Sequence, residues 1–313
     1  MAAGTSKTVI YAAFIGNALI AVSKFVAAGF TGSSAMLSEG IHSVVDCGNQ
    51  LLLLFGLRRA ELKPDKKHPF GYGMELYFWT FVVAILIFAV GAGVSMYEGI
   101  ERIRHPHPLS NVVWNYGVLG LGMVFEGVAW YIAYRAFNRE RGDLPFMAAI
   151  RQSKDPTVFT VLFEDTAAML GLLIAFVGVA GAEHFGIPEL DGVASVGIGI
   201  VLAIVAVLLA IEAKGLLIGE SADPEIVRHI EDMADGDQRI WRTNEILTMH
   251  LGPNDILLNA SFDFVQGLSA DEVEAAISQF ERKIKTAYPS IRRVFIEAQS
   301  WRAHAADAEK QLN

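Results

Sequence analysis

An imidazole and a carboxylate lie one helical turn apart within an otherwise apolar stretch of the chain. His42 and Asp46 are four residues apart inside Met36–Leu57, so a helix would place both on one face. Ionisable groups at membrane depth are costly and usually mark an ion pathway. A divalent metal ion is the simplest species that satisfies both groups, so the spacing predicts a metal site.

The same helix face carries further polar residues. Glu39, His42, Asp46 and Asn49 follow one another at steps of three, four and three and form one polar stripe. The stripe either only hydrogen-bonds neighbouring helices or serves a function. Burying two carboxylates is costly, which favours a functional role. Glu39 lies closest to the outer end of this segment, where it either binds the metal or contacts water. Cys47 points about 100° away from Asp46, which favours packing over ligation.

A second pair of carboxylates occurs in another apolar stretch. Glu164 and Asp165 are adjacent, so their side chains point about 100° apart and cannot face one point equally. Either one, reaching His42 and Asp46, would complete a set of nitrogen and oxygen ligands. Such a set suits zinc, and also Mn²⁺, Fe²⁺ or Co²⁺, because affinity order alone does not choose among them.

Three more polar residues lie in apolar stretches. Glu126 is a ligand, a proton carrier or the partner of Lys24, and the sequence gives these roles equal weight. Asn17 and Lys24 are seven residues apart and share one helix face, where a structural role is at least as well supported as a functional one.

Apolar runs long enough to cross about 30 Å of hydrocarbon position these residues. The chain has 313 residues, of which 53% are hydrophobic. The six runs are Val9–Phe30, Met36–Leu57, Met74–Tyr97, Val112–Phe137, Thr157–Ala180 and Val193–Ile218. From Glu220 onward there are 17 acidic against 10 basic residues. We therefore expect a six-helix membrane domain over residues 1–218 and an acidic soluble part after it.

Loop charges predict the orientation. Basic residues are concentrated in the loops after the second and fourth runs, and the first and fifth loops lack them, although the third loop, with Arg102 and Arg104, runs against this trend. The positive-inside rule then places both termini in the cytoplasm. We interpret the first run as a retained helix rather than a cleaved signal peptide. A bacterial inner membrane is the expected location, with an organelle membrane as the alternative.

The C-terminal part reads as a small domain over residues 219–302. A helix at Asp223–Met233 is followed by strands at Asn244–His250 and Ile256–Phe264, a helix opened by a capping box at Ser269–Glu272, and a strand at Arg293–Gln299. This αββαβ order predicts a compact α+β, ferredoxin-like unit. A unit of this size is marginal alone, so we expect dimerisation to cover its sheet. Residues 303–313 are expected to form a frayed polar tail.

Four passages make the chain similar to the cation diffusion facilitators, a family of divalent-metal/proton exchangers. They are Ser38–Asp46, the run His68-Pro-Phe-Gly-Tyr-Gly73 with Glu75, Glu98–Arg102 followed by Pro106, and Met249–Pro253 in the tail. The second is the most specific. The run Leu162–Ala168 resembles the zinc-transporter-nine-like branch of the family.

The resemblance implies six helices, a cytoplasmic metallochaperone-like tail, a homodimer and a transport site built from the second and fifth segments. His42 and Asp46 take the second-segment ligand positions, and Asp165 takes the second position of the fifth segment. One turn earlier the family has His or Asp, whereas this chain has Val161. Glu164 is the candidate replacement, and the identity of the metal depends on it.

The expected function is therefore divalent metal efflux, with Zn²⁺/H⁺ antiport by alternating access as the leading hypothesis. The rival is a non-transporting metal sensor or scaffold with the same fold, a reading that Val161 supports. A channel would differ in lacking proton-dependent flux. The chain has no Ser–His–Asp arrangement, phosphate loop or HExxH motif, so we expect no enzyme, no cofactor and no nucleic-acid partner.

In the tail, His250 is a surface or dimer-interface residue or a regulatory ligand.

Overall fold

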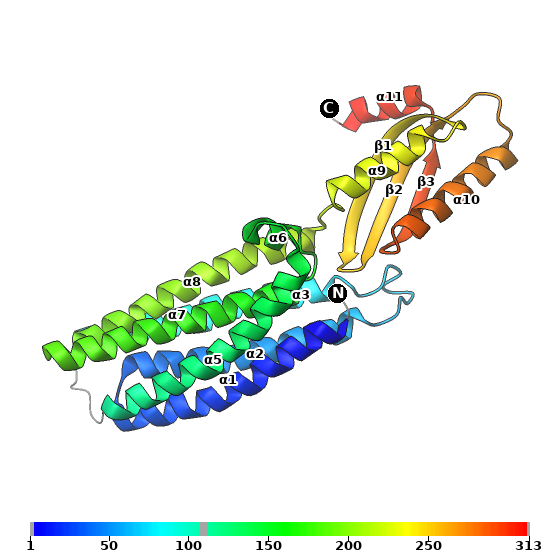
Figure 1. Cartoon of the computed structure of the whole chain (residues 1–313). Helices are drawn as coiled ribbons and strands as arrows, with labels where there is room; N and C mark the ends of the chain where they lie inside the picture. Colours follow the sequence, from blue (N-terminus) through cyan, green and yellow to red (C-terminus); the bar gives the residue numbers. More distant parts are fainter. Residues whose placement is uncertain (1–2, 107–111, 312–313) are drawn as a thin grey trace. The chain divides into compact units, whose positions relative to one another are not determined.

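Two units make up the chain in the computed structural model, which describes residues 3–106 and 112–311 (Figure 1). The helical unit comprises Met1–Glu61 and Glu75–Lys214, and the second unit, which holds a sheet, comprises Leu62–Met74 and Gly215–Asn313. The domain limits expected at residues 218 and 302 stay predictions. The loop between the second and third apolar segments belongs to the second unit.

The helical unit consists of long apolar helices. Five stretches of the described residues are long and apolar enough to cross a membrane: Val9–Thr31, Glu75–Arg104, Val113–Arg139, Pro156–Phe185 and Glu189–Ile218. They lie in α1 (Ala3–Thr31), in α3, η1 and α4 (Glu75–Leu86, Ile87–Ala92 and Gly93–Arg104), and in α5 (Val112–Arg141), α7 (Pro156–Phe185) and α8 (Glu189–Ile218). These five match five of the six predicted segments.

The remaining predicted segment forms α2 (Ser34–Ala60), a continuous helix of 27 residues. The polar stripe lowers the mean hydropathy of this helix, so α2 is not among the five apolar stretches of the described residues. The helix packs against α1, α3 and α7. These neighbours cover the face of α2 that carries the polar stripe, so its polar residues face protein rather than lipid. Ser33 caps the helix by accepting a hydrogen bond from the backbone N–H of Met36 over 3.2 Å.

Two elements of the helical unit were not expected from the sequence. The third apolar segment contains the π-helical stretch η1 between α3 and α4, and the short helix α6 (Phe146–Gln152) precedes α7. Neither a π-helical turn within an apolar run nor a seven-residue helix changes the hydrophobic pattern enough to be recognised.

The second unit has the predicted αββαβ order. It contains α9 (Pro224–Asp235), β1 (Ile240–Gly252), β2 (Asp255–Phe264), α10 (Ala270–Ala287) and β3 (Ile291–Ala298). The sheet order is β1-β2-β3, with β1 antiparallel and β3 parallel to β2. The predicted capping box of Ser269 and Glu272 opens α10. Ile230, Leu258, Phe262, Phe280 and Ile284 share one core, which joins both helices to the sheet.

The frayed tail expected over residues 303–313 extends past the described residues, which end at residue 311. Residues Trp301–Gln311 form helix α11. The backbone N–H of Trp301 donates to Asp263 over 2.8 Å, and the guanidinium of Arg242 lies 3.5 Å from the centroid of the Trp301 ring. These contacts fix the first turn, and the alanine-rich sequence that follows has high helix propensity.

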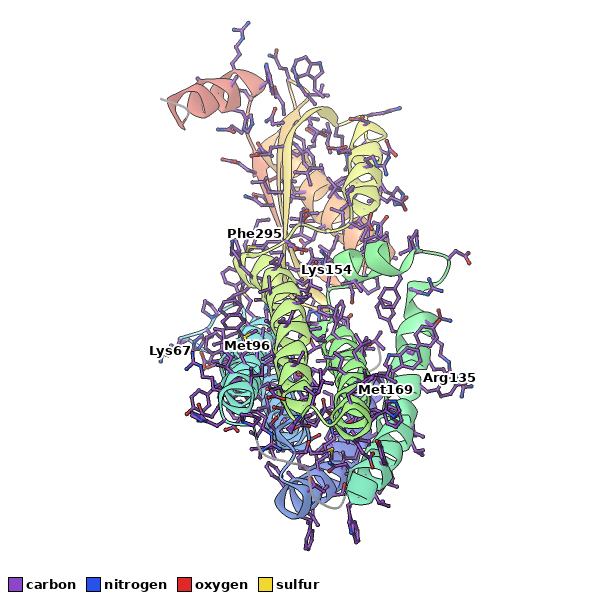
Figure 2. The ribbon with its side chains drawn as sticks, turned by 90° about the vertical axis from the view of Figure 1, so that its left-hand side faces the viewer. Lys67, Met96, Arg135, Lys154, Met169 and Phe295 are labelled. Atoms are coloured by element: carbon purple, nitrogen blue, oxygen red, sulfur yellow. The ribbon has the colours of Figure 1, made fainter. Side chains whose placement is uncertain are left out.

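The loop Leu62–Met74 lies against the turn between β1 and β2. A side chain at Gly73 would collide with the carbonyl oxygen of Leu251, so only glycine permits this approach. Gly71 has a φ of +87°, a left-handed conformation that glycine adopts without steric cost. Lys66 and Lys67 are exposed, and no ion pair joins either to another described residue. Lys67 stands out from the loop in Figure 2.

Candidate metal site

Helix α2 places the predicted polar stripe in the interior of the helical unit. Glu39, His42, Asp46 and Asn49 are all buried, with at most 1% of each residue exposed. His42 Nδ1 lies 3.4 Å from Asp46 Oδ1, as the spacing of one helical turn predicts. The pair is thus oriented by the helix itself, before any contact with another element.

Helix α7 contributes the second pair of carboxylates. Asp155 caps this helix and Pro156 occupies its first turn, which fixes where it begins. Glu164 and Asp165 are each 1% exposed. Asn49 Nδ2 on α2 donates to Glu164 Oε1 over 2.9 Å. This hydrogen bond connects the two helices that carry the predicted ligands.

Several polar atoms of these residues have no hydrogen-bond partner within the described part of the chain. They are both ring nitrogens of His42, Asp46 Oδ1, Glu164 Oε2 and both carboxylate oxygens of Asp165. Leaving such atoms unpaired in a dry interior costs free energy. Imidazole nitrogen and carboxylate oxygen are also the donor atoms that divalent transition metals bind.

The structure brings the predicted ligands together in pairs rather than as one complete set. Among the described residues, no group of three or more His, Cys, Asp or Glu side chains is placed to hold one metal ion. His42 lies beside Asp46 without a hydrogen bond between them, and Asn49 donates to Glu164. Asp46 nevertheless lies within electrostatic range of both Glu164 and Asp165. Closing a single site therefore requires movement of side chains or helices.

Glu39 and Glu126, two further candidates for ligation, face a lysine instead. Lys24 Nζ donates to Glu39 Oε2 over 2.9 Å and lies 3.8 Å from Glu126 Oε1. Glu39, for which contact with water was one alternative, is fully buried. Of the three roles considered for Glu126, partnership with Lys24 agrees with this geometry. Cys47 is half-buried, one position beyond Asp46.

Carboxylates outnumber cations among the buried groups around this site. Lys24 is the cation of the cluster, and the acids are Glu39, Asp46, Glu126, Glu164 and Asp165. In a low-dielectric interior such an excess is tolerated only when protons or bound cations neutralise it. The cluster is therefore suited chemically to exchanging protons for a cation.

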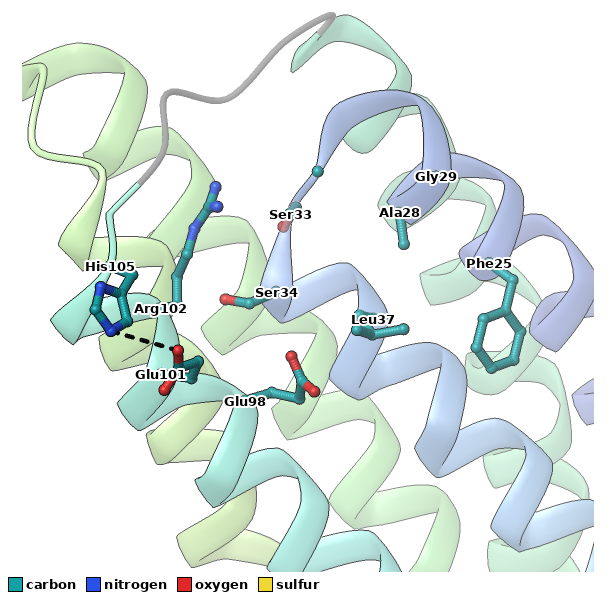
Figure 3. Close-up of a pocket in the computed structure, with 11 residues that line it drawn as sticks. Phe25, Ala28, Gly29, Ser33, Ser34, Leu37, Glu98, Glu101, Arg102 and His105 are labelled. Atoms are coloured by element: carbon teal, nitrogen blue, oxygen red, sulfur yellow. Dashed lines mark ion pairs between the residues drawn. The ribbon is translucent and has the colours of Figure 1, made fainter.

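A separate polar cluster at the start of α8 was missed in the sequence. Asp191 accepts hydrogen bonds from the Ser33 and Ser34 hydroxyls over 2.6 and 2.9 Å, and it pairs with Arg102 over 3.7 Å. Arg102 and both serines also line a cavity of about 450 Å³ between α1, α2 and α4 (Figure 3). The candidate ligands are not among its lining residues. In the sequence, Asp191 resembles an ordinary loop carboxylate, so its contacts with the serines and Arg102 could not be predicted.

The histidines of the second unit are separate from one another. His250 is 5% exposed and its Nδ1 lies 3.2 Å from the Gly252 carbonyl oxygen, so the alternative that places it at the surface is wrong. His229 contacts the Tyr288 hydroxyl, and His304 lies 3.2 Å from Gln299. These contacts give no support to a regulatory metal site in the described part of the tail.

Apolar helices long enough to cross a membrane that enclose imidazole and carboxylate atoms without hydrogen-bond partners, as seen in the described residues, are typical of proteins that move ions. A family model described as the cation efflux transmembrane domain matches residues 10–218, and the chain belongs to this family. This finding confirms the family expected from the four sequence passages. The apolar helices and the α+β tail expected of that family are both present in the described residues.

Similar proteins come from distant organisms. The chain is 33% identical to "Proton-coupled zinc antiporter SLC30A9, mitochondrial" of Mus musculus over 83% of its own length and 46% of the relative's. It is 28% identical to "Metal tolerance protein C4" of Arabidopsis thaliana, over 79% of this chain and 55% of that protein. It is 24% identical to "Magnetosome protein MamB" of Magnetospira, over 92% and 93%. The chain thus spans about half the length of the zinc antiporters that it matches.

Proposed function

We propose that the chain exports a divalent metal ion, with Zn²⁺ as the leading substrate, in exchange for protons by alternating access. The observation that carries this proposal is the buried, unpaired set of donor atoms on α2 and α7. The likeness to proteins named as proton-coupled zinc antiporters supports both the metal and the counter-ion. Family membership supports transport rather than catalysis.

The proposed site consists of His42 and Asp46 on α2 and Glu164 and Asp165 on α7. Each of these groups binds either a proton or the metal through the same atoms, so the two compete. Metal arriving from the cytoplasm displaces protons, and protons from the other side displace the metal. This competition at one site is sufficient for antiport, provided that the site faces one side at a time.

We also propose that the chain works as a homodimer with both termini in the cytoplasm. One face of the tail sheet carries Leu247 and Phe295, each 53% exposed, and Phe295 is labelled in Figure 2. Covering these side chains in a second copy would remove apolar surface from water. The basic loops after the second and fourth apolar segments support the orientation. The bacterial inner membrane stays a prediction.

Metal uptake into proteoliposomes with an imposed pH gradient tests the proposed function. Zn²⁺, Mn²⁺, Fe²⁺ and Co²⁺ are offered separately to the wild type and to Asp46→Ala. We expect proton-dependent uptake that is lost in Asp46→Ala and retained in Asp143→Ala, which removes an exposed carboxylate from a loop. Equal transport by His42→Ala, Asp46→Ala and Asp165→Ala would contradict the site.

Val161 supports a second candidate function. This residue is fully buried at the position where the resemblance predicts a ligand, and no complete ligand group is found in the described residues. A membrane metal sensor or scaffold with this fold would not need tight ligation. Absence of flux for all four metals, from protein that is demonstrably folded, would favour that function.

A further inference from the structure

Lys24 on α1 is buried completely within the helical unit. Its Nζ donates to Glu39 Oε2 and to Ser43 Oγ on α2, each over 2.9 Å, and lies 3.8 Å from Glu126 Oε1 on α5. An ammonium group is expensive at this depth unless it is paired. Here oxygen atoms from two other helices surround it, as they would surround a bound cation.

Neighbouring residues are shaped to admit this arrangement. A side chain at Gly171 on α7 would collide with Glu39 Oε1, so glycine at this position leaves room for the carboxylate that pairs with Lys24. In the amide orientation that satisfies its neighbours, Asn17 donates to Glu126 over 3.1 Å and accepts from Gln50 over 2.9 Å. The lysine and its two carboxylates therefore form a packed and hydrogen-bonded unit.

This unit borders the proposed transport site. Ser43, which accepts a hydrogen bond from Lys24, directly follows His42, and Glu39 lies one turn before it on the same helix. Lys24 Nζ thus lies 2.9 Å from groups on either side of His42 along α2. Charges that are poorly screened at this depth influence each other over longer distances than in water.

We propose that Lys24 is a tethered cation that offsets one of the two negative charges of Glu39 and Glu126 and so sets the affinity of the adjoining site for a divalent ion. The inference rests on the proposed function. Because the ammonium is covalently attached, it cannot be transported, and it fills a position among carboxylates that a second mobile cation would otherwise occupy. The balance between Lys24 and its two acids then determines how strongly the site of His42 and Asp46 attracts metal.

The proposal predicts effects of opposite sign for the two members of the pair. Glu39→Gln removes one negative charge and leaves Lys24 with Glu126 alone, so the surroundings of the site become more positive and the site binds Zn²⁺ more weakly. Lys24→Gln leaves the acids undercompensated, so the same site binds Zn²⁺ more tightly or a second ion binds. Lys24→Gln/Glu39→Gln restores the original charge and brings the affinity back towards that of the wild type. Each single change should alter Kd by at least about tenfold, as expected for a unit charge in a medium of low dielectric constant.

Equilibrium Zn²⁺ binding to the purified full chain at one fixed pH measures these effects. The matched control is Lys7–Glu61, an exposed pair at 2.7 Å with side chains 34% and 51% exposed. Lys7→Gln and Glu61→Gln make the same charge changes in water and should leave Kd within about twofold. Asp46→Ala identifies the part of the binding that belongs to the membrane site.

A structural role for Lys24 would give a different pattern. It would weaken binding in both single variants or leave Glu39→Gln unchanged, and either result would overturn the proposal. If Lys24→Gln does not fold, Glu39→Gln and the double variant still test the proposal. Only charge balance predicts that Zn²⁺ affinity falls in Glu39→Gln and recovers in the double variant. Equal Zn²⁺ binding by the wild type and Asp46→Ala would instead refute the proposed site itself, so the two failures are distinguishable.

Discussion

The side-chain amide of Asn49 donates a hydrogen bond to Glu164 over 2.9 Å, and this contact connects α2 to α7 at the level of the candidate ligands. It holds one carboxylate oxygen of Glu164 and leaves the other without a partner in the described residues. Val161, one turn before Asp165, offers no donor atom. We therefore propose that Glu164 supplies the oxygen donor that Val161 lacks.

Replacing Glu164 by Gln should reduce Zn²⁺ affinity at least about tenfold, because the amide retains an acceptor for Asn49 but removes the negative charge. Val161→Asp/Glu164→Gln should recover much of the loss, since Asp is close to Val in size and restores a carboxylate on the same helix. Equilibrium Zn²⁺ binding and uptake measure both effects. Unchanged binding by Glu164→Gln would exclude this residue from the site.

Zn²⁺ binding should release protons and weaken as the pH falls. His42 and the three carboxylates proposed as ligands must be deprotonated to bind metal, so each displaced proton lowers the apparent affinity by about tenfold per pH unit. Titration calorimetry in two buffers with different ionisation enthalpies counts the protons. The release should disappear in Asp46→Ala, and pH-independent binding by the wild type would argue against antiport through this site.

The loop Leu62–Met74 should lose order in acid at a pH set by Asp65. The Tyr72 hydroxyl donates to Asp65 Oδ2 over 2.7 Å, and the backbone N–H groups of His68 and Lys67 donate to Oδ1, so the pKa of Asp65 lies below its usual value. The stabilisation is present above the pKa of the unfolded chain and is lost as the pH falls through the lowered pKa of the folded chain.

Hydrogen exchange of the Lys67 and His68 amides measures this transition. Tyr72→Phe removes one donor and should move the loss of protection to higher pH. The same transition in wild type and Tyr72→Phe would show that the hydroxyl does not stabilise the ionised carboxyl.

Two phenylalanines of the tail, replaced one at a time by alanine, should affect different properties: one the folding stability of the tail and the other its dimerisation. Phe280 is 1% exposed and its ring packs edge-on against Phe262, so Phe280→Ala should destabilise the second unit by about 3–5 kcal/mol. Phe295 is 53% exposed, so Phe295→Ala should barely change the denaturation midpoint of the tail but weaken the dimer. Denaturation and light scattering of the full chain measure the two effects, and an unchanged mass for Phe295→Ala would contradict an interface on this face.

Much of the architecture could be predicted because local patterns dictate it. Apolar runs longer than a bilayer become helices, since only a helix satisfies its own backbone in hydrocarbon. The capping box at Ser269 and the alternation of Leu258, Ala260 and Phe262 likewise specify α10 and β2 without reference to distant residues. Helix α11 was not predicted, because the anchoring of Trp301 by Asp263 and Arg242 is a contact between residues far apart in sequence.

The sequence by itself determined which residues could bind metal, because the facing of His42 and Asp46 follows from the periodicity of a single helix. Only the tertiary structure decided how the other polar residues are divided among partners. Helix packing brings Glu39 and Glu126 next to Lys24. It also forms the hydrogen bonds between Asn49 and Glu164, and between Asp191 and the hydroxyls of Ser33 and Ser34. These pairings join different helices, and the rotation of one helix against another depends on the packing of all their side chains, which no local pattern encodes.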